Sequence, residues 1–147
     1  MNTDDPLEGI TIQFPSGRSA SLRSVVDSWT QHVTRLYAER HNDLARNPSS
    51  WGAHDYLAAL YIRDRVAIGL AQAPLEVANI AQSRVTSADR LFFSYAEPDT
   101  TDILSRFERV EHDDSAWWWK RIPATGPARE ELIRAVSGNA VSLRRLG

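Results

Sequence analysis

The sequence predicts a mainly α-helical fold, a bundle of four to five helices with a small N-terminal β-hairpin. Two observations support this. Apolar residues recur at helical spacing over three long stretches that Pro-containing breaks separate, and a short alternating segment with a turn signal precedes them. At 147 residues the chain is expected to form a single domain. The hairpin would span about 10–22, the helical bundle about 22–137 and a flexible tail 138–147.

The hairpin is predicted from the segment before the first helix. Residues 10–14 alternate apolar and polar side chains, as a half-buried strand does. Residues Pro15–Arg18 favour a turn, because proline presets φ and glycine supplies positive φ. Residues 19–22 would return as the second strand. An isolated hairpin is marginal in water, so the helices are expected to cover it.

Three long helices are then predicted, each with one apolar stripe. The first runs from about Leu22 to Leu44 and ends before the break at Asn47–Ser50. The second runs from about Trp51 to Gln72, with Ser49 or Ser50 as its cap. The third runs from about Leu75 to Ala96, because Pro74 suits a position at the start of a helix.

Shorter elements are predicted for the last third of the chain. A fourth helix is expected at Thr100–Val110. Residues Trp117–Pro123 are expected to be extended or a last helical turn, since the proline biases its predecessor away from helical geometry. A final helix is expected at Pro127–Val136, ended by Gly138 and Asn139.

The composition narrows the class of protein. The absence of cysteine excludes disulfides, thiolate metal sites and a cysteine nucleophile, and it fits a reducing cytoplasm, where we expect the protein to act. No apolar run approaches the roughly 20 residues of a membrane span, so no membrane association is expected. The start of the chain lacks the layout of a secretory signal. The net charge of −2 makes nucleic acid an unlikely partner.

Charge is distributed unevenly along the chain. Residues 97–114 carry seven acids and two arginines, whereas residues 115–147 carry six basic residues and two acids. The acidic segment therefore precedes a basic one. This pattern is either solvated surface that partly neutralises itself or one side of a charged binding surface.

Two aspartates occupy positions where the helical stripes call for apolar residues. These are Asp64 in the second helix and Asp89 in the third. One interpretation is a carboxylate pair for acid–base chemistry or metal binding. The favoured one is structural buried charge, in which each aspartate pairs with an arginine such as Arg63, Arg84 or Arg35. The histidines lack zinc spacing and there is no nucleophile or phosphate-binding motif, so no catalytic residue, metal ligand or cofactor is predicted.

The run Trp117-Trp118-Trp119 is the most unusual local feature. Three consecutive indoles cannot share one face of a strand or helix, so at least one is expected to be partly exposed or covered by Lys120 or Arg121. The run is interpreted as a lid on the bundle, as an anchor for a partner protein, or as a stacking platform for nucleic acid. The predicted partner-binding surface comprises Asp99, Asp102, Glu111, Asp113, Asp114, Trp117, Trp118, Trp119, Lys120 and Arg121.

A set of short motifs in order along the chain resembles a known class of protein. The motifs are Ile12–Arg18, Trp29, Tyr56, Leu60–Asp64, Asp89, Phe92-Phe93, Trp117–Pro123 and Gly126-Pro127. Together they resemble small, mostly helical immunity-type proteins of polymorphic toxin systems in high-GC Gram-positive bacteria. The resemblance implies a non-enzymatic inhibitor that docks on a cognate toxin, and it transfers no binding residues.

The predicted function is therefore a non-enzymatic protein-binding module, an immunity protein or antitoxin against a partner toxin. Acidic segments suit inhibitors of basic nucleases, because complementary charge speeds association. Two alternatives remain at this point. One is a small metal-dependent hydrolase using Asp64 and Asp89, and the other is a self-associating helical regulatory protein. The oligomeric state and the identity of the partner do not follow from the sequence.

Overall fold

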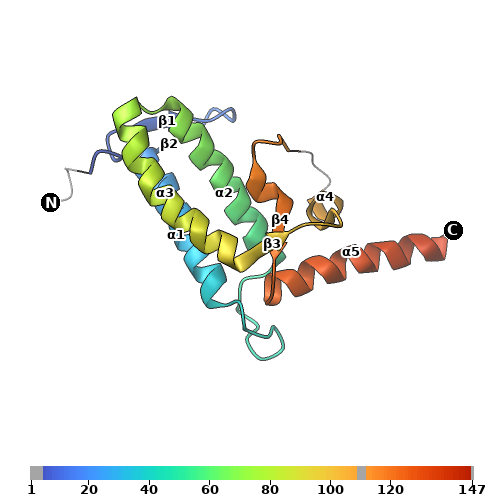
Figure 1. The fold of residues 1–147 in the computed structure, drawn as a ribbon. Coiled ribbons are helices and arrows are strands. Elements are labelled where there is room, and N and C mark those ends of the chain that lie inside the picture. The colour runs from blue at the N-terminus through green and yellow to red at the C-terminus, as the bar shows by residue number, and fades with distance from the viewer. Residues whose placement is uncertain (1–4, 109–111, 147) are drawn as a thin grey trace.

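The computed structural model describes residues 5–108 and 112–146, and it confirms the predicted mainly α-helical fold with an N-terminal hairpin (Figure 1). In chain order its elements are β1 (Thr11–Gln13), β2 (Ser19–Ser21), α1 (Leu22–Ala38), α2 (Ala53–Gln72), α3 (Leu75–Tyr95), β3 (Ala96–Pro98), α4 (Ile103–Glu108), the 3-10 turn η1 (Trp117–Lys120), β4 (Arg121–Pro123) and α5 (Pro127–Leu146).

The core lies along α1. This helix packs extensively on both α2 and α3, which contact each other much less (Figure 1). Trp29 from α1, Tyr56 from α2 and Phe92 from α3 are fully buried at the centre. The Phe92 ring lies 5.3 Å from Trp29 and 6.0 Å from Tyr56, so one aromatic cluster joins the three helices.

The hairpin covers one end of the bundle, as its marginal stability requires. Its strands pair antiparallel, and Ile12 is fully buried against α2. A side chain at Gly69 would place its Cβ 2.9 Å from Leu22 and 3.4 Å from Ile12, so this glycine permits the close approach. The Gln72 side chain accepts from the backbone N–H of Gln13 at 3.0 Å and donates to its carbonyl at 2.7 Å. The end of α2 is thereby bonded to the edge of the hairpin.

The predicted boundaries of two helices are wrong. Helix α1 ends at Ala38, six residues before the expected Leu44. Helix α2 begins at Ala53 after Gly52, so neither Ser49 nor Ser50 is the cap. The Glu131 carboxylate of α5 accepts the N–H of Ala53 at 2.9 Å instead, and any Cβ at Gly52 would collide with it. A substituent at Gly52 would therefore force the Glu131 side chain away from this cap.

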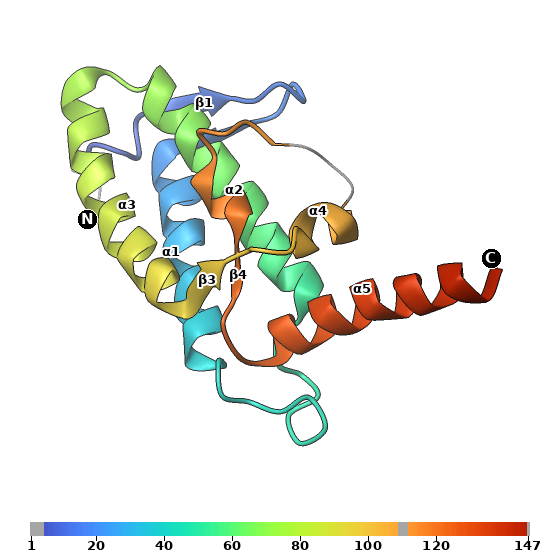
Figure 2. The same ribbon diagram turned by 45° about the vertical axis from the view of Figure 1, so that its right-hand side comes forward.

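Helix α5 is longer than predicted. It passes through Gly138 and Asn139, where it was expected to end, and continues to Leu146. A terminating glycine usually adopts positive φ, and Gly138 does not. Ala128, Leu132 and Val136 anchor the first half of the helix in the core. The remainder projects from the body of the molecule (Figure 2).

A second two-stranded sheet was not predicted. Strand β3 pairs antiparallel with β4, with Glu97 opposite Ile122. This pairing brings the segment after α3 beside η1, the tryptophan turn (Trp117–Lys120), and holds the two segments in register. Among the described residues, no helix is long and apolar enough to cross a bilayer.

Candidate functional site

The tryptophan turn closes the space between α2 and α3. Trp118 and Trp119 are only 5% and 6% exposed, whereas Trp117 is half-buried. The Trp117 ring lies 6.0 Å from Phe92 and 5.4 Å from Phe93 on α3. The geometry matches the interpretation of the run as a lid. Trp118 and Trp119 therefore lack the exposure of a surface anchor, because their indoles are packed into the helix bundle.

Asp64 holds two of the tryptophans in place. Its Oδ1 atom accepts the indole N–H of Trp118 at 2.7 Å and that of Trp119 at 2.8 Å. Among the described residues, no arginine forms an ion pair with Asp64, so that prediction is wrong for this aspartate. The two indole N–H groups are its partners instead. A charged acceptor gives strong hydrogen bonds to donors that burial has removed from water.

Asp89 and Arg63 form the predicted buried ion pair. Arg63 is 6% exposed and donates to both Asp89 oxygens, at 2.9 and 3.0 Å. Asp89 also accepts the indole N–H of Trp29 at 3.0 Å. The Arg63 guanidinium lies 4.3 Å from the centre of the Trp118 ring, so the cation over the run is Arg63 rather than Lys120 or Arg121.

The hydrolase alternative places Asp64 and Asp89 in one carboxylate pair. Asp64 binds indoles and Asp89 binds a guanidinium, so the two carboxylates serve different partners. Within residues 5–108 and 112–146, no group of three or more His, Asp or Glu side chains could hold a metal ion. The other suggested arginines are also engaged elsewhere, Arg84 with Asp5 and Arg35 with Glu39.

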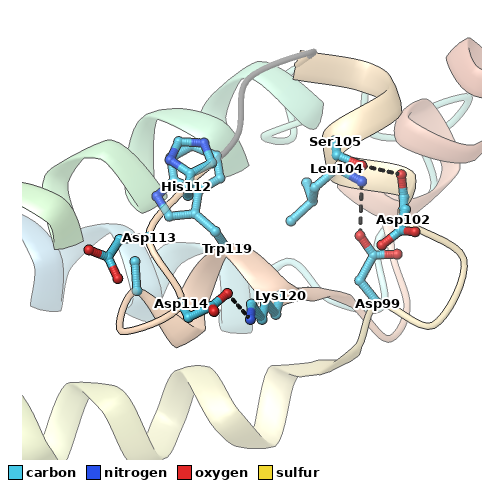
Figure 3. A pocket seen from close by; sticks show the side chains of 10 residues that line it. Asp99, Asp102, Leu104, Ser105, His112, Asp113, Asp114, Trp119 and Lys120 are labelled. Atoms are coloured by element: carbon cyan, nitrogen blue, oxygen red, sulfur yellow. Dashed lines mark hydrogen bonds and ion pairs between the residues drawn. The ribbon is translucent and has the colours of Figure 1, made fainter.

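An acidic pocket of about 450 Å³ opens beside the turn (Figure 3). Its lining residues come from the segment around α4, the loop before η1, and η1 itself. They are Asp99, Asp102, Leu104, Ser105, His112, Asp113, Asp114, Ala116, Trp119 and Lys120. Four of these ten side chains are aspartates, which make this cavity the acidic pocket.

One end of the acidic pocket is built by the start of α4. The two carboxylate oxygens of Asp99 accept the backbone N–H groups of Ile103 and Leu104, at 2.8 and 2.9 Å. Asp99 thus caps the helix, and its negative charge lies at the positive end of the helix dipole. Asp102, in the left-handed region at φ 56°, is exposed beside it.

The opposite end is built by the loop before η1 (Figure 3). The carboxylate of Asp113 accepts the N–H of Ser115, and this bond holds the pKa of Asp113 below its usual range. Asp114 and Lys120 form an exposed ion pair at 2.9 Å. The His112 ring stacks on Trp119, with the ring centres 3.6 Å apart and the planes at 6°. An aromatic wall thus stands between the two acidic ends.

The predicted binding residues divide into groups. Six of them line the acidic pocket together: Asp99, Asp102, Asp113, Asp114, Trp119 and Lys120. Trp117 and Arg121 lie against Phe93 instead, and Trp118 is buried between the two sides. Glu111 lies outside the described residues. Sequence reasoning missed His112 as a wall of the pocket, although its place in the acidic loop was a usable signal.

Comparison with protein-family models, curated proteins and solved structures found no match to this chain. The pocket presents carboxylates at two ends and an aromatic wall between them, an arrangement suited to binding cations.

Proposed function

We propose that this protein is a non-enzymatic binding module whose acidic pocket docks a basic segment of a partner protein. The observation that carries the proposal is the charge of the pocket. Its lining contains four aspartates and one lysine, a net charge of −3 with histidine neutral. Carboxylates pair with arginine through two parallel hydrogen bonds, which gives both energy and orientation.

The dimensions of the pocket support a side chain as the ligand. A volume of about 450 Å³ is at the smaller end of ligand pockets, which span roughly 300–1,000 Å³. One or two extended basic side chains would fill it. The carboxylates would repel the phosphates of a nucleic acid, so that class of partner is disfavoured.

The partner we propose is a toxin, and the protein would be its immunity protein or antitoxin in the cytoplasm. The motif resemblance supports this assignment, and a charged docking site is consistent with it, since complementary charge speeds association and suppresses wrong partners. A stable scaffold also suits an inhibitor that blocks a surface.

The test compares two double variants that change charge equally. Asp113→Lys/Asp114→Lys reverses the exposed end of the acidic pocket, whereas Glu8→Lys/Glu76→Lys reverses two exposed acids at a distance from it. Tagged wild type and both variants are used as bait in the native cell. We expect one stoichiometric partner to be retained by wild type and by the distant variant, and to be lost from the pocket variant.

A functional measurement then identifies the class of partner. The retained protein is expressed alone and together with each bait. The proposal requires that it arrests growth alone, that wild type restores growth, and that the pocket variant does not. A partner held equally well by the pocket variant would overturn the docking site, and a harmless partner would overturn the assignment as an immunity protein.

A further inference from the structure

A second hollow lies on the other flank of the tryptophan turn. It has a volume of about 370 Å³ and is lined by Thr86, Asp89, Arg90, Phe93 and Trp117. It shares no lining residue with the acidic pocket, which Trp119 borders. We call this hollow the aromatic slot.

The aromatic slot displays an unusually accessible phenylalanine. Phe93 is 52% exposed although it belongs to a helix that contributes Phe92 to the core. Its ring lies 5.4 Å from that of Trp117, with the planes tilted by 50°. Exposed aromatic side chains beside arginine are characteristic of the anchor positions in protein interfaces. A single apolar side chain could occupy the hollow and pack against these two rings.

The charge around the aromatic slot is positive, opposite to that of the acidic pocket. The guanidinium of Arg121 lies 3.7 Å from the centre of the Phe93 ring and donates to the carbonyl of Ala96 at 2.6 Å. Arg90 is exposed on the lining itself. Among the described residues, neither arginine forms an ion pair. Burial lowers the pKa of Arg121, because its guanidinium has lost part of its hydration.

The nearby carboxylates do not neutralise these arginines. Asp89 is bound through both oxygens to Arg63 and also accepts from Trp29. Glu97, on the strand beside Arg121, pairs with Arg129 at 2.6 Å. Two cationic side chains therefore flank an apolar slot without a partner carboxylate among the described residues, and a docked acidic group would supply one.

We propose that the aromatic slot docks an acidic segment of a protein partner. An apolar side chain of that segment occupies the slot and packs against the exposed Phe93 ring beside Trp117, and an adjacent carboxylate pairs with Arg90 or Arg121. This goes beyond the proposed function, because the ligand has the opposite charge and a different flank of the turn receives it. A polyanion such as nucleic acid fits less well, since the acidic pocket on the neighbouring flank would repel its remaining phosphates.

The experiment uses two matched peptides and the whole protein. One peptide has a central Phe-Leu pair flanked by glutamates, and the other has lysines in place of the glutamates. Each is titrated into isotope-labelled protein, and backbone amide and indole resonances are followed by NMR. We expect the glutamate peptide to shift the Trp117 indole and the amides of Arg90 and Phe93, and the lysine peptide to leave them in place.

Variants assign the binding to the aromatic slot. Arg90→Glu and Phe93→Ala should each weaken the glutamate peptide about fivefold or more, as is common for interface anchors. The matched controls Arg134→Glu and Leu75→Ala, which are also at exposed positions, should leave the affinity unchanged. All four substitutions are at exposed side chains, and the far-ultraviolet circular dichroism of each variant should match that of wild type.

Three results would overturn the proposal. The first is no shift at Arg90, Phe93 and Trp117, or equal shifts with the lysine peptide. The second is tighter binding of a single-stranded oligonucleotide to the same residues. The third is a concentration-dependent shift of these resonances without peptide, which would assign the slot to a second copy of the chain. If the variant Asp113→Lys/Asp114→Lys still binds the glutamate peptide, the aromatic slot is supported independently of the acidic pocket. The failure of one proposal can thus be distinguished from the failure of the other.

Discussion

Replacing Asp64 with alanine should strongly destabilise the protein. The side chain receives two indole N–H groups on one oxygen atom, at 2.7 and 2.8 Å. Its removal leaves both donors without an acceptor. Because Trp118 and Trp119 are 5% and 6% exposed, water cannot readily replace the carboxylate.

The magnitude follows from the number and kind of bonds. A hydrogen bond to a charged group contributes about 1.5–3 kcal/mol. Asp64 is half-buried, so solvent weakens its field and the lower limit applies. Two bonds then amount to roughly 3 kcal/mol in the free energy of unfolding. Asp64→Asn keeps an acceptor oxygen and loses only the charge, so it should cost about 1 kcal/mol.

The assay is urea denaturation followed by far-ultraviolet circular dichroism, because tryptophan fluorescence would itself change in these variants. The reasoning is refuted if Asp64→Ala unfolds within about 0.5 kcal/mol of wild type, the range of an ordinary surface substitution. It is also refuted if Asp64→Asn is as damaging as Asp64→Ala. A double-mutant cycle with Trp118→Phe should show coupling, because that variant removes one of the two donors.

Two further outcomes are expected elsewhere in the chain. Gly126→Ala should destabilise by about 2 kcal/mol, because Gly126 has φ +93° and a Cβ would lie 2.8 Å from the Arg40 carbonyl oxygen. Gly138→Ala, with nothing within 4 Å of the added Cβ, should instead stabilise α5 by about 0.5–1 kcal/mol in the same urea denaturation assay. A loss of stability there would contradict the continuous helix. The hydrogen bond to Glu108, aided by burial, raises the pKa of Tyr61 to about 12. The contribution of this raised pKa to the free energy of unfolding is therefore complete below pH 10 and is lost as the pH rises through 12. Glu108→Gln should lower the pKa of Tyr61, measured by tyrosinate absorbance.

The sequence predicted the elements that depend on local patterns. The apolar stripes located α1, α2 and α3, and the Pro15–Arg18 turn located the hairpin, because helical periodicity and turn chemistry involve residues close in sequence. The predictions failed where a residue distant in the sequence determines the local structure. The cap of α2 comes from Glu131, 78 residues away from Ala53, and β3 exists only because β4 pairs with it. Neither partner leaves a local signal.

The charge of the candidate site could be predicted from the sequence, whereas the arrangement of its residues in space could not. The acidic run contains Asp99, Asp102, Asp113 and Asp114, which the fold brings together in the lining of one pocket, and their charge is read directly from the sequence. The sequence left open whether the tryptophan run is a buried lid or an exposed anchor, because the acceptor of Trp118 and Trp119, Asp64, lies 54 and 55 residues away. The opposite charge on the other flank was missed for the same reason, since Arg90 and Arg121 meet at Phe93 only in the folded chain.

The 3-10 geometry of η1 resolves the difficulty of three adjacent tryptophans. A 3-10 turn has about three residues per turn, so successive side chains leave the backbone roughly 120° apart. Trp117 borders the aromatic slot, Trp118 lies beneath Arg63, and Trp119 borders the acidic pocket. A strand would have placed the first and third indoles on one face and merged the two environments. The turn instead keeps a positive surface and a negative surface apart, while Asp64 anchors the wall between them. Loss of Asp64 should therefore disturb peptide binding at the aromatic slot and at the acidic pocket together, whereas a surface variant such as Arg90→Glu disturbs only its own side.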